Sequence, residues 1–148
     1  MKKTMKIILL AGFCGGIAEL AWITLVSAVT PVSGMEVVRQ VSATVLPAMV
    51  DTAGAAPAGI AIHLLLSILL AAGFIWAVWL PYSRKLSPIS ALLVATAALS
   101  GVWAINFLII LPVLNPTLVG LMPYAVTLTS KILFGIAMGQ GLLRADRV

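Results

Sequence analysis

The sequence predicts an all-α membrane protein, a four-transmembrane-helix bundle with a short amphipathic helix in the first outward loop. The chain has 148 residues, of which 62% are hydrophobic and only 9% are charged, whereas a soluble domain has charge at about a quarter of its positions. The apolar residues form long runs. Four runs reach the ~20 residues that a helix needs to cross the ~30 Å hydrocarbon core of a membrane. We therefore expect one integral membrane domain, residues 1–148.

The four predicted spans account for most of the chain. Their expected limits are about 7–29, 59–80, 89–111 and 118–143. Basic residues cluster before the first span, between the second and third, and after the fourth (Lys2, Lys3, Lys6, Arg84, Lys85, Arg144 and Arg147). Segments rich in Lys and Arg stay in the cytoplasm, so we expect both termini there and a multi-pass protein of the bacterial inner membrane. Because these residues mark the ends of apolar runs, they indicate contact with the lipid bilayer and not with nucleic acid.

The first outward loop carries a helix signal of its own. Ser33 and Glu36 have the spacing of a capping box, which marks the start of a helix. Valines then recur at helical spacing, and Pro47 ends the run. The pattern predicts an amphipathic helix over about 34–46, lying on the membrane surface or across the mouth of the bundle. It is either a tether or a lid over an outward cavity, with "TAGAAPAG", residues 52–59, as its hinge.

Glu19 is an acid in the middle of the first span. A charge at mid-membrane costs about 2.5–3.5 kcal/mol even on permissive insertion scales, and it normally faces a partner inside the bundle. Lys131 has the opposite sign, and both residues lie 12 positions from the cytoplasmic end of their spans, Ile7 and Leu143, or ~18 Å at the helical rise. We expect an intramembrane charge pair that fixes helix register. The alternatives are a pair that responds to protons or a ligand, a protonated Glu19, or a Lys131 that reaches away to the interface.

Glycines lie at helical spacing below both charges. Gly12 and Gly16 lie on the face of Glu19, and Gly135 and Gly139 repeat the same spacing after Lys131. Small residues allow two helices to approach closely in lipid. The pattern therefore predicts that the first and fourth spans pack against each other along these glycines.

A second set of polar residues is expected at a level nearer the outward side. They are spread over all four spans (His63, Asn106, Thr24, Ser27, Tyr124 and Thr127). Together they predict a small polar pocket that opens outward. The alternative is that each forms a hydrogen bond between helices or, for Ser and Thr, a bond to its own helix backbone.

Neither a metal site nor a cofactor is expected. A metal site needs several ligands in one place, and the chain has one histidine and one cysteine, His63 and Cys14, at different depths. Haem held by histidine and methionine is a minor alternative. No nucleophile–base pair, phosphate loop or carboxylate dyad is visible, so no intrinsic enzyme activity is expected.

Two resemblances add to these expectations. The four-span layout is similar to small uncharacterised bacterial inner-membrane proteins, with a Gly-rich first span, a long outward segment before a "G-x-x-x-H" motif (Gly59 to His63), and a last span that ends in glycines, "KILFGIAMG". This likeness covers most of the chain and implies no particular activity.

The second resemblance is local. The stretch "GGIAELAW" resembles the first helix of small multidrug resistance transporters. That likeness implies that Glu19 binds protons and cationic drugs in turn. The chain departs from that family in its greater length, its amphipathic outer segment, its strongly one-way topology and Lys131, which would neutralise the carboxylate that a cation needs.

The sequence therefore leaves two principal functions open. The first is a small integral membrane protein without catalysis, either an accessory subunit or a binder of a small hydrophobic molecule. The second is a proton-coupled small-molecule transporter that uses Glu19. Expected partners are the bilayer and either other membrane subunits or further copies of the chain.

Overall fold

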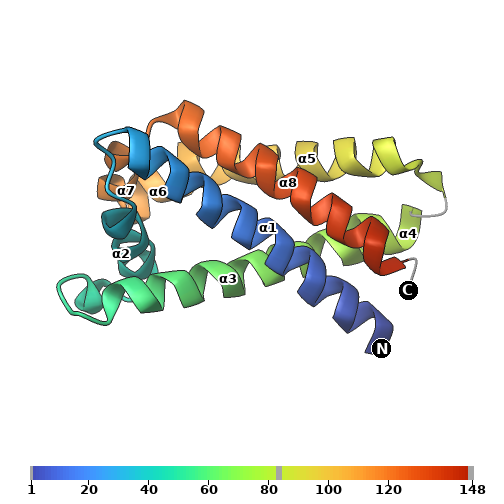
Figure 1. The fold of residues 1–148 in the computed structure, drawn as a ribbon, viewed down its shortest axis with the longest axis horizontal. Coiled ribbons are helices and arrows are strands. Elements are labelled where there is room, and N and C mark those ends of the chain that lie inside the picture. The colour runs from blue at the N-terminus through green and yellow to red at the C-terminus, as the bar shows by residue number, and fades with distance from the viewer. Residues whose placement is uncertain (1, 83–84, 147–148) are drawn as a thin grey trace.

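The computed structural model describes residues 2–82 and 85–146, and this part of the chain is mostly helical, with short turns and loops between the helices. Four helical segments there are long and apolar enough to cross a membrane: Lys3–Val29, Ala55–Tyr82, Pro88–Leu114 and Tyr124–Arg144. They run side by side, and both ends of the chain lie at the same end of the molecule (Figure 1). This arrangement is that of a multi-pass membrane protein.

The described residues form eight α-helices, one 3-10 turn and two π-helical turns. The first long segment is α1 (Lys2–Val29), and α2 (Gly34–Val45) and a 3-10 turn (Pro47–Met49) follow it. The second is α3 (Ala55–Phe74), a π-helical turn (Ile75–Trp79) and α4 (Leu80–Tyr82). The third is α5 (Pro88–Ile105), a π-helical turn (Asn106–Ile110) and α6 (Leu111–Leu114). The chain ends with α7 (Pro116–Leu121) and α8 (Tyr124–Asp146).

Both π-helical turns precede a proline. The turn Ile75–Trp79 ends shortly before Pro81, and the turn Asn106–Ile110 ends shortly before Pro112. A proline inside a helix lacks an N–H, and its ring clashes with the carbonyl of residue i−4. A wider turn accommodates that clash without breaking the helix, so both spans continue past their prolines.

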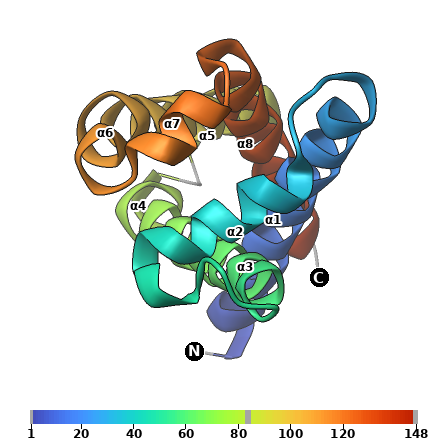
Figure 2. The same ribbon diagram turned by 90° about the vertical axis from the view of Figure 1, so that its left-hand side faces the viewer.

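The fourth long helix begins at Tyr124 and not near residue 118. Met122 is extended, with φ −118° and ψ 118°, because a residue that precedes a proline avoids the helical region. Pro123 then starts α8, and its carbonyl accepts the first hydrogen bonds of that helix. Residues 116–121 form the separate helix α7, which lies across the end of the bundle with α2 (Figure 2).

Most of the segment expected to be a hinge is part of a packed helix. Ala55 opens α3 and is fully buried. Gly59 lies one turn later against α2, where a methyl group in place of its hydrogen would overlap the carbonyl oxygen of Val38. Residues 52–54 of the stretch form an exposed turn before α3. The small residues Ala55 and Gly59 allow α2 and α3 to touch closely.

Two buried clusters hold the helices together. The cluster at the end with the chain termini joins all four long segments through side chains such as Ala11, Ile75, Ala95, Phe134 and Met138. A smaller cluster lies at the α2 end and combines α1, α2, the second π-helical turn, α6 and α7 (Ile23, Val37, Phe107, Leu111, Leu118 and Met122). The candidate site lies against this second cluster, whose six residues all line it.

Candidate functional site

Glu19 and Lys131 form an ion pair between α1 and α8. The Lys131 Nζ donates to Glu19 Oε2 at 2.6 Å, and the Ser130 hydroxyl donates to Glu19 Oε1 at 2.7 Å. The side chains of Glu19 and Lys131 are only 13% and 12% exposed. Both carboxylate oxygens thus have a donor, which satisfies a charge that would be costly in lipid without a partner.

The lysine is also held by an aromatic ring. The Lys131 Nζ lies 5.3 Å from the ring centroid of Phe134, within the range of a cation–π interaction. Phe134 is fully buried one turn further along α8. The ring and the carboxylate together direct the ammonium into the bundle, away from the interface that it would reach from an unpartnered position.

His63 of α3 joins the pair from a third helix. Its Nε2 lies 3.2 Å from the Gly16 carbonyl oxygen and 3.9 Å from Glu19 Oε2. A carbonyl oxygen only accepts hydrogen bonds, so Nε2 carries the hydrogen in this contact. The charge pair and the histidine, expected at different levels, therefore form one polar cluster.

This cluster is part of the wall of a partly open cavity of about 210 Å³ within the bundle. Glu19, Lys131, Ser130 and His63 supply its polar side. Much of the remaining wall is apolar and comes from α1, α2, α3, the second π-helical turn, α6 and α7 (among others Leu20, Ile23, Val41, Leu66, Phe107 and Leu118). An apolar cavity with a few convergent polar groups is the usual form of a small-molecule site.

Three of the six residues expected in a polar pocket line this cavity: His63, Asn106 and Thr127. Thr127 is buried, and its hydroxyl accepts from Trp103 Nε1 at 2.9 Å. The sequence did not indicate that Trp103 serves a neighbouring helix, because a tryptophan in a span is equally typical of a lipid-facing position.

The other three residues do not line it, which corrects the expected pocket. The Thr24 hydroxyl donates to Leu20 O at 2.8 Å, and the Ser27 hydroxyl donates to Ile23 O at 2.7 Å, each within α1. Short hydroxyl side chains in a helix satisfy themselves in this way. Tyr124 is 48% exposed and packs edge-on against Trp103.

Gly12 and Gly16 of α1 face α3 and not α8, contrary to the expected seam. A Cβ at Gly12 would meet the backbone of Ile68 at 2.6 Å, and a Cβ at Gly16 would meet the Ser67 hydroxyl at 2.8 Å. Ser67 is itself buried and donates to the His63 carbonyl at 2.8 Å. These two glycines therefore let α3 cross α1 closely and bring His63 to Glu19.

Gly135 and Gly139 of α8 face α5, whereas Gly141, nearer the end of α8, lies against the Ala11 backbone of α1. A Cβ at Gly135 would meet the Thr96 backbone at 2.6 Å, and one at Gly139 would meet the Leu92 side chain at 2.8 Å. The helices α1 and α8 do pack against each other, but at other positions. Gly15 receives the ring of Phe134 there, and the pair Gly12 and Gly16 takes no part.

The α2 end of the cavity is covered by α2 and α7. Ser33 caps α2, accepting from the Glu36 N–H at 3.2 Å, while the Glu36 carboxylate accepts from Gln40 Nε2 at 2.7 Å. Asn115, which caps α7, donates from Nδ2 to the Gln40 carbonyl at 2.8 Å and to Thr44 Oγ1 at 3.0 Å. Asn115 is buried and was missed by the sequence reasoning. Its position directly before Pro116, in "LNPT", is typical of a helix cap, because asparagine favours the N-cap and proline the first turn of a helix.

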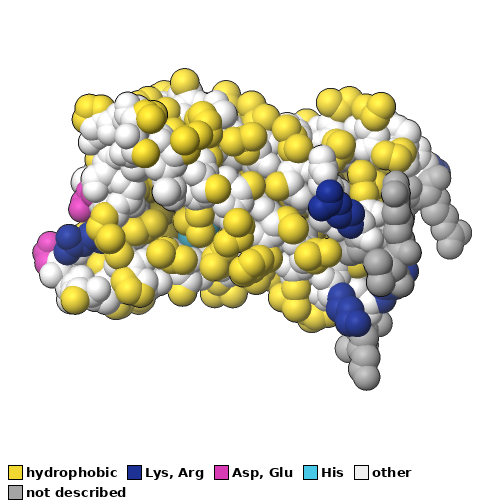
Figure 3. Space-filling view, in the orientation of Figure 1, with side chains coloured by type: hydrophobic (Ala, Val, Ile, Leu, Met, Phe, Trp, Pro, Cys, Tyr) yellow, Lys and Arg dark blue, Asp and Glu magenta, His cyan; other side chains and the backbone are white. Residues whose placement is uncertain are grey.

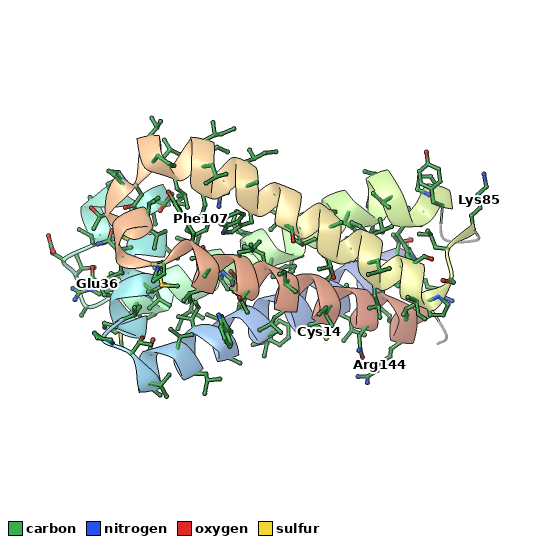
Figure 4. All side chains as sticks on the ribbon, turned by 90° about the horizontal axis from the view of Figure 1, so that it is seen from above. Cys14, Glu36, Lys85, Phe107 and Arg144 are labelled. Atoms are coloured by element: carbon green, nitrogen blue, oxygen red, sulfur yellow. The ribbon has the colours of Figure 1, made fainter. Side chains whose placement is uncertain are left out.

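Apart from the buried pair Glu19 and Lys131, charged residues lie at the two ends of the molecule. Glu36 lies at the α2 end, and Lys85 and Arg144 lie at the opposite end (Figure 4). Between the ends, the visible face has mainly hydrophobic side chains (Figure 3). On that face the acidic groups lie at one end of the molecule and most of the basic groups at the other. Within the described residues, no three His, Cys, Asp or Glu side chains gather in a way that would hold a metal ion.

Comparison of the chain with models of known protein families, with curated proteins and with solved structures gave no match.

Proposed function

We propose that this chain is a small integral membrane protein, without catalysis of its own, that binds a small hydrophobic molecule inside its helix bundle. The observation that carries the proposal is the partly open cavity of about 210 Å³ within the bundle, with Glu19 and Lys131 on its polar side and aliphatic walls around it. An apolar cavity of about 150 Å³ already admits benzene. The volume therefore suits a ligand of one or two rings, or the end of a longer chain.

The hydrogen bonds of the charge pair support a binding role over catalysis. Glu19 accepts from both Ser130 and Lys131, so its carboxylate is committed to a neutral pair and is not poised as a free base. The pair supplies polarity at a fixed place, as sites that orient a ligand do.

The charge distribution supports a location and an orientation. We propose that the protein lies in the bacterial inner membrane with both termini in the cytoplasm. Lys85 and Arg144 lie at the end where the chain begins and ends, and Lys and Arg favour the cytoplasmic side. The α2 end, with Glu36 and Asp51, then faces outward.

Native mass spectrometry of protein purified from membranes tests the binding function. The wild type is expected to carry a small-molecule adduct. Val41→Phe puts a larger side chain into the cavity wall and is expected to lose the adduct. Leu69→Phe adds a ring at a position that is 57% exposed and outside the cavity wall, so it is expected to keep the adduct. A wild type without an adduct, or an adduct that survives Val41→Phe, contradicts the proposal.

A second candidate is proton-coupled transport through Glu19, which is favoured by the position of this carboxylate on the cavity wall. In that case, proteoliposomes with an imposed proton gradient should accumulate a small cation, and Glu19→Gln should abolish the accumulation. Accumulation at the level of empty liposomes rules this candidate out.

A further inference from the structure

Asn106 is a polar side chain of the cavity that the protein leaves without a partner. It opens the second π-helical turn and is half-buried. Among the residues that the structure describes, none forms a hydrogen bond with its side-chain amide. A primary amide has two N–H donors and a carbonyl acceptor, and polar groups at membrane depth are normally satisfied. The amide is therefore available to a molecule in the cavity.

The charges around the cavity already cancel. Glu19 and Lys131 lie 2.6 Å apart and sum to zero. Glu19 and Lys131 are the only Asp, Glu, Lys or Arg residues in the described cavity wall, and the neutral His63 tautomer that donates from Nε2 to the Gly16 carbonyl adds no charge. A ligand with a net charge would leave an unbalanced charge in a low-dielectric interior, which is strongly unfavourable. An uncharged ligand leaves the balance intact.

One side of the cavity is not closed by packed helices. Within the described chain, α1 packs on both α3 and α8, α8 packs on α5, and α2 packs on α3. In contrast, α3 makes few close approaches to α5, to α6 or to the π-helical turn between them. These elements lie on opposite sides of the bundle in the end view (Figure 2). Leu66 of α3 lines the cavity and is 46% exposed. We infer that this side faces the bilayer when the four long helices span a membrane, so that a molecule dissolved in lipid would reach the cavity without crossing water.

We propose that the ligand is an uncharged, lipid-dissolved amphiphile whose hydroxyl or carbonyl group is bound by Asn106, with its apolar part against the aliphatic walls. This inference rests on the proposed binding function and adds the charge state, the source and the residue that recognises the polar group. Asn106 is the group that distinguishes such a ligand from a plain hydrocarbon, because a site with an unsatisfied amide discriminates against a molecule that cannot pair with it.

Four probes of matched shape test the charge state and the polar group: 2-naphthol, naphthalene, 2-naphthoate and 2-naphthylmethylammonium. Equilibrium dialysis against the purified full chain in one detergent measures bound probe, and the Val41→Phe protein supplies the micelle background. At neutral pH, 2-naphthol is expected to bind at least tenfold more tightly than each of the other three.

Asn106→Leu, which keeps the shape of the side chain but removes its amide, tests the recognising residue. Its affinity for 2-naphthol is expected to fall to the wild-type affinity for naphthalene, while its own affinity for naphthalene is unchanged or higher. The probe series on the wild type stands without this variant, so a variant that fails to fold leaves the main test intact.

Three results overturn the inference. One is a charged probe that binds as well as 2-naphthol, and another is a folded Asn106→Leu protein that binds 2-naphthol as the wild type does. The third is the absence of binding by all four probes. If native mass spectrometry still shows an adduct that Val41→Phe removes, then the binding function stands and only the proposed ligand class is wrong.

Discussion

Glu19 lies in a helix whose neighbouring residues are almost all apolar or small. Side chains from two further helices stabilise its buried charge. Ser130 and Lys131 of α8 donate to its two oxygens, and His63 of α3 approaches Oε2 to 3.9 Å. A buried ion pair contributes little net stability, but losing one partner leaves an unpaired charge at a large cost. The pair therefore acts mainly on which helices meet and at which register.

The first prediction concerns this pair. Glu19→Gln and Lys131→Met are each expected to lower the free energy of unfolding by about 3–5 kcal/mol, because each leaves one buried charge unpaired. The double variant Glu19→Gln/Lys131→Met is expected to be more stable than either single variant, because no charge remains. Unfolding of the purified protein in mixed micelles with rising denaturing detergent measures all three against the wild type.

Glu36→Gln is the control for the pair. Glu36 lies at the α2 end of the molecule, and its carboxylate accepts a hydrogen bond from Gln40 Nε2. A glutamine at position 36 still has an oxygen that can accept this bond, so Glu36→Gln is expected to change stability by less than about 1 kcal/mol. If the double variant is no more stable than the less stable single variant, the charges of Glu19 and Lys131 do not compensate each other.

At the level of the helices, small residues decide which neighbours touch. Gly12 and Gly16 admit α3, Gly135 and Gly139 admit α5, and Gly59 admits α2. A Cβ atom at any of these positions would overlap with backbone atoms or with a packed side chain of the neighbouring helix. Close approach of helix backbones of this kind is the main means by which helices associate in lipid.

The second prediction compares two glycines of α3. Gly59→Ala puts a methyl group against the Val38 carbonyl, and overpacking of this kind costs about 1–3 kcal/mol. Gly73→Ala meets nothing within 4 Å, so it is expected to stabilise the helix by about 0.5–1 kcal/mol. Thermal unfolding of the two variants in one detergent measures the opposite signs, and equal shifts would show that α2 does not pack on Gly59.

Over the whole molecule, charge and hydropathy define two ends and an apolar belt. The basic end holds both chain termini, and the other end is covered by α2 and α7 (Figures 1 and 2). Because Lys and Arg favour the cytoplasm, the chain is expected to insert in one direction only. The cavity then opens nearer the outer half of the membrane.

The third prediction concerns this orientation. On a Cys14→Ala background, Thr52→Cys at the α2 end is expected to react with a membrane-impermeant maleimide in intact spheroplasts, and Met5→Cys is expected to react only after permeabilisation. Both positions are exposed in the structure. Labelling of Met5→Cys in intact spheroplasts would show that the termini face outward or that the chain inserts both ways.

The positions of the spans could be predicted because hydropathy and run length are local properties of the chain. The level of Glu19 and Lys131 could be predicted for a related reason, since a helix rises by a constant ~1.5 Å per residue; the structure places the two groups 2.6 Å apart. The start of α8 differs from the expected residue 118 because Pro123 interrupts the helix, although the apolar run on which the expectation rests continues through it.

The glycine contacts and the cavity could not be predicted in the same way. Gly12 was expected to face α8 and faces α3, and Thr24 was expected in a pocket and bonds within α1. Which face of a helix meets which neighbour depends on the packing of all four spans together, and the glycine spacing is compatible with several arrangements. Nothing local in "VWAINFLIILP" indicates that Asn106 lacks a protein partner.

The amino-acid sequence alone therefore establishes a four-span helical chain with an acid and a base at one depth, because these features follow from composition and from the geometry of a single helix. The fold is needed to bring His63 to Glu19, to turn the spacing of Gly12 and Gly16 into a crossing with α3, and to leave a cavity against the packed cluster at the α2 end. These features arise from contacts between residues far apart in the chain, and such contacts exist only once the helices have found their neighbours.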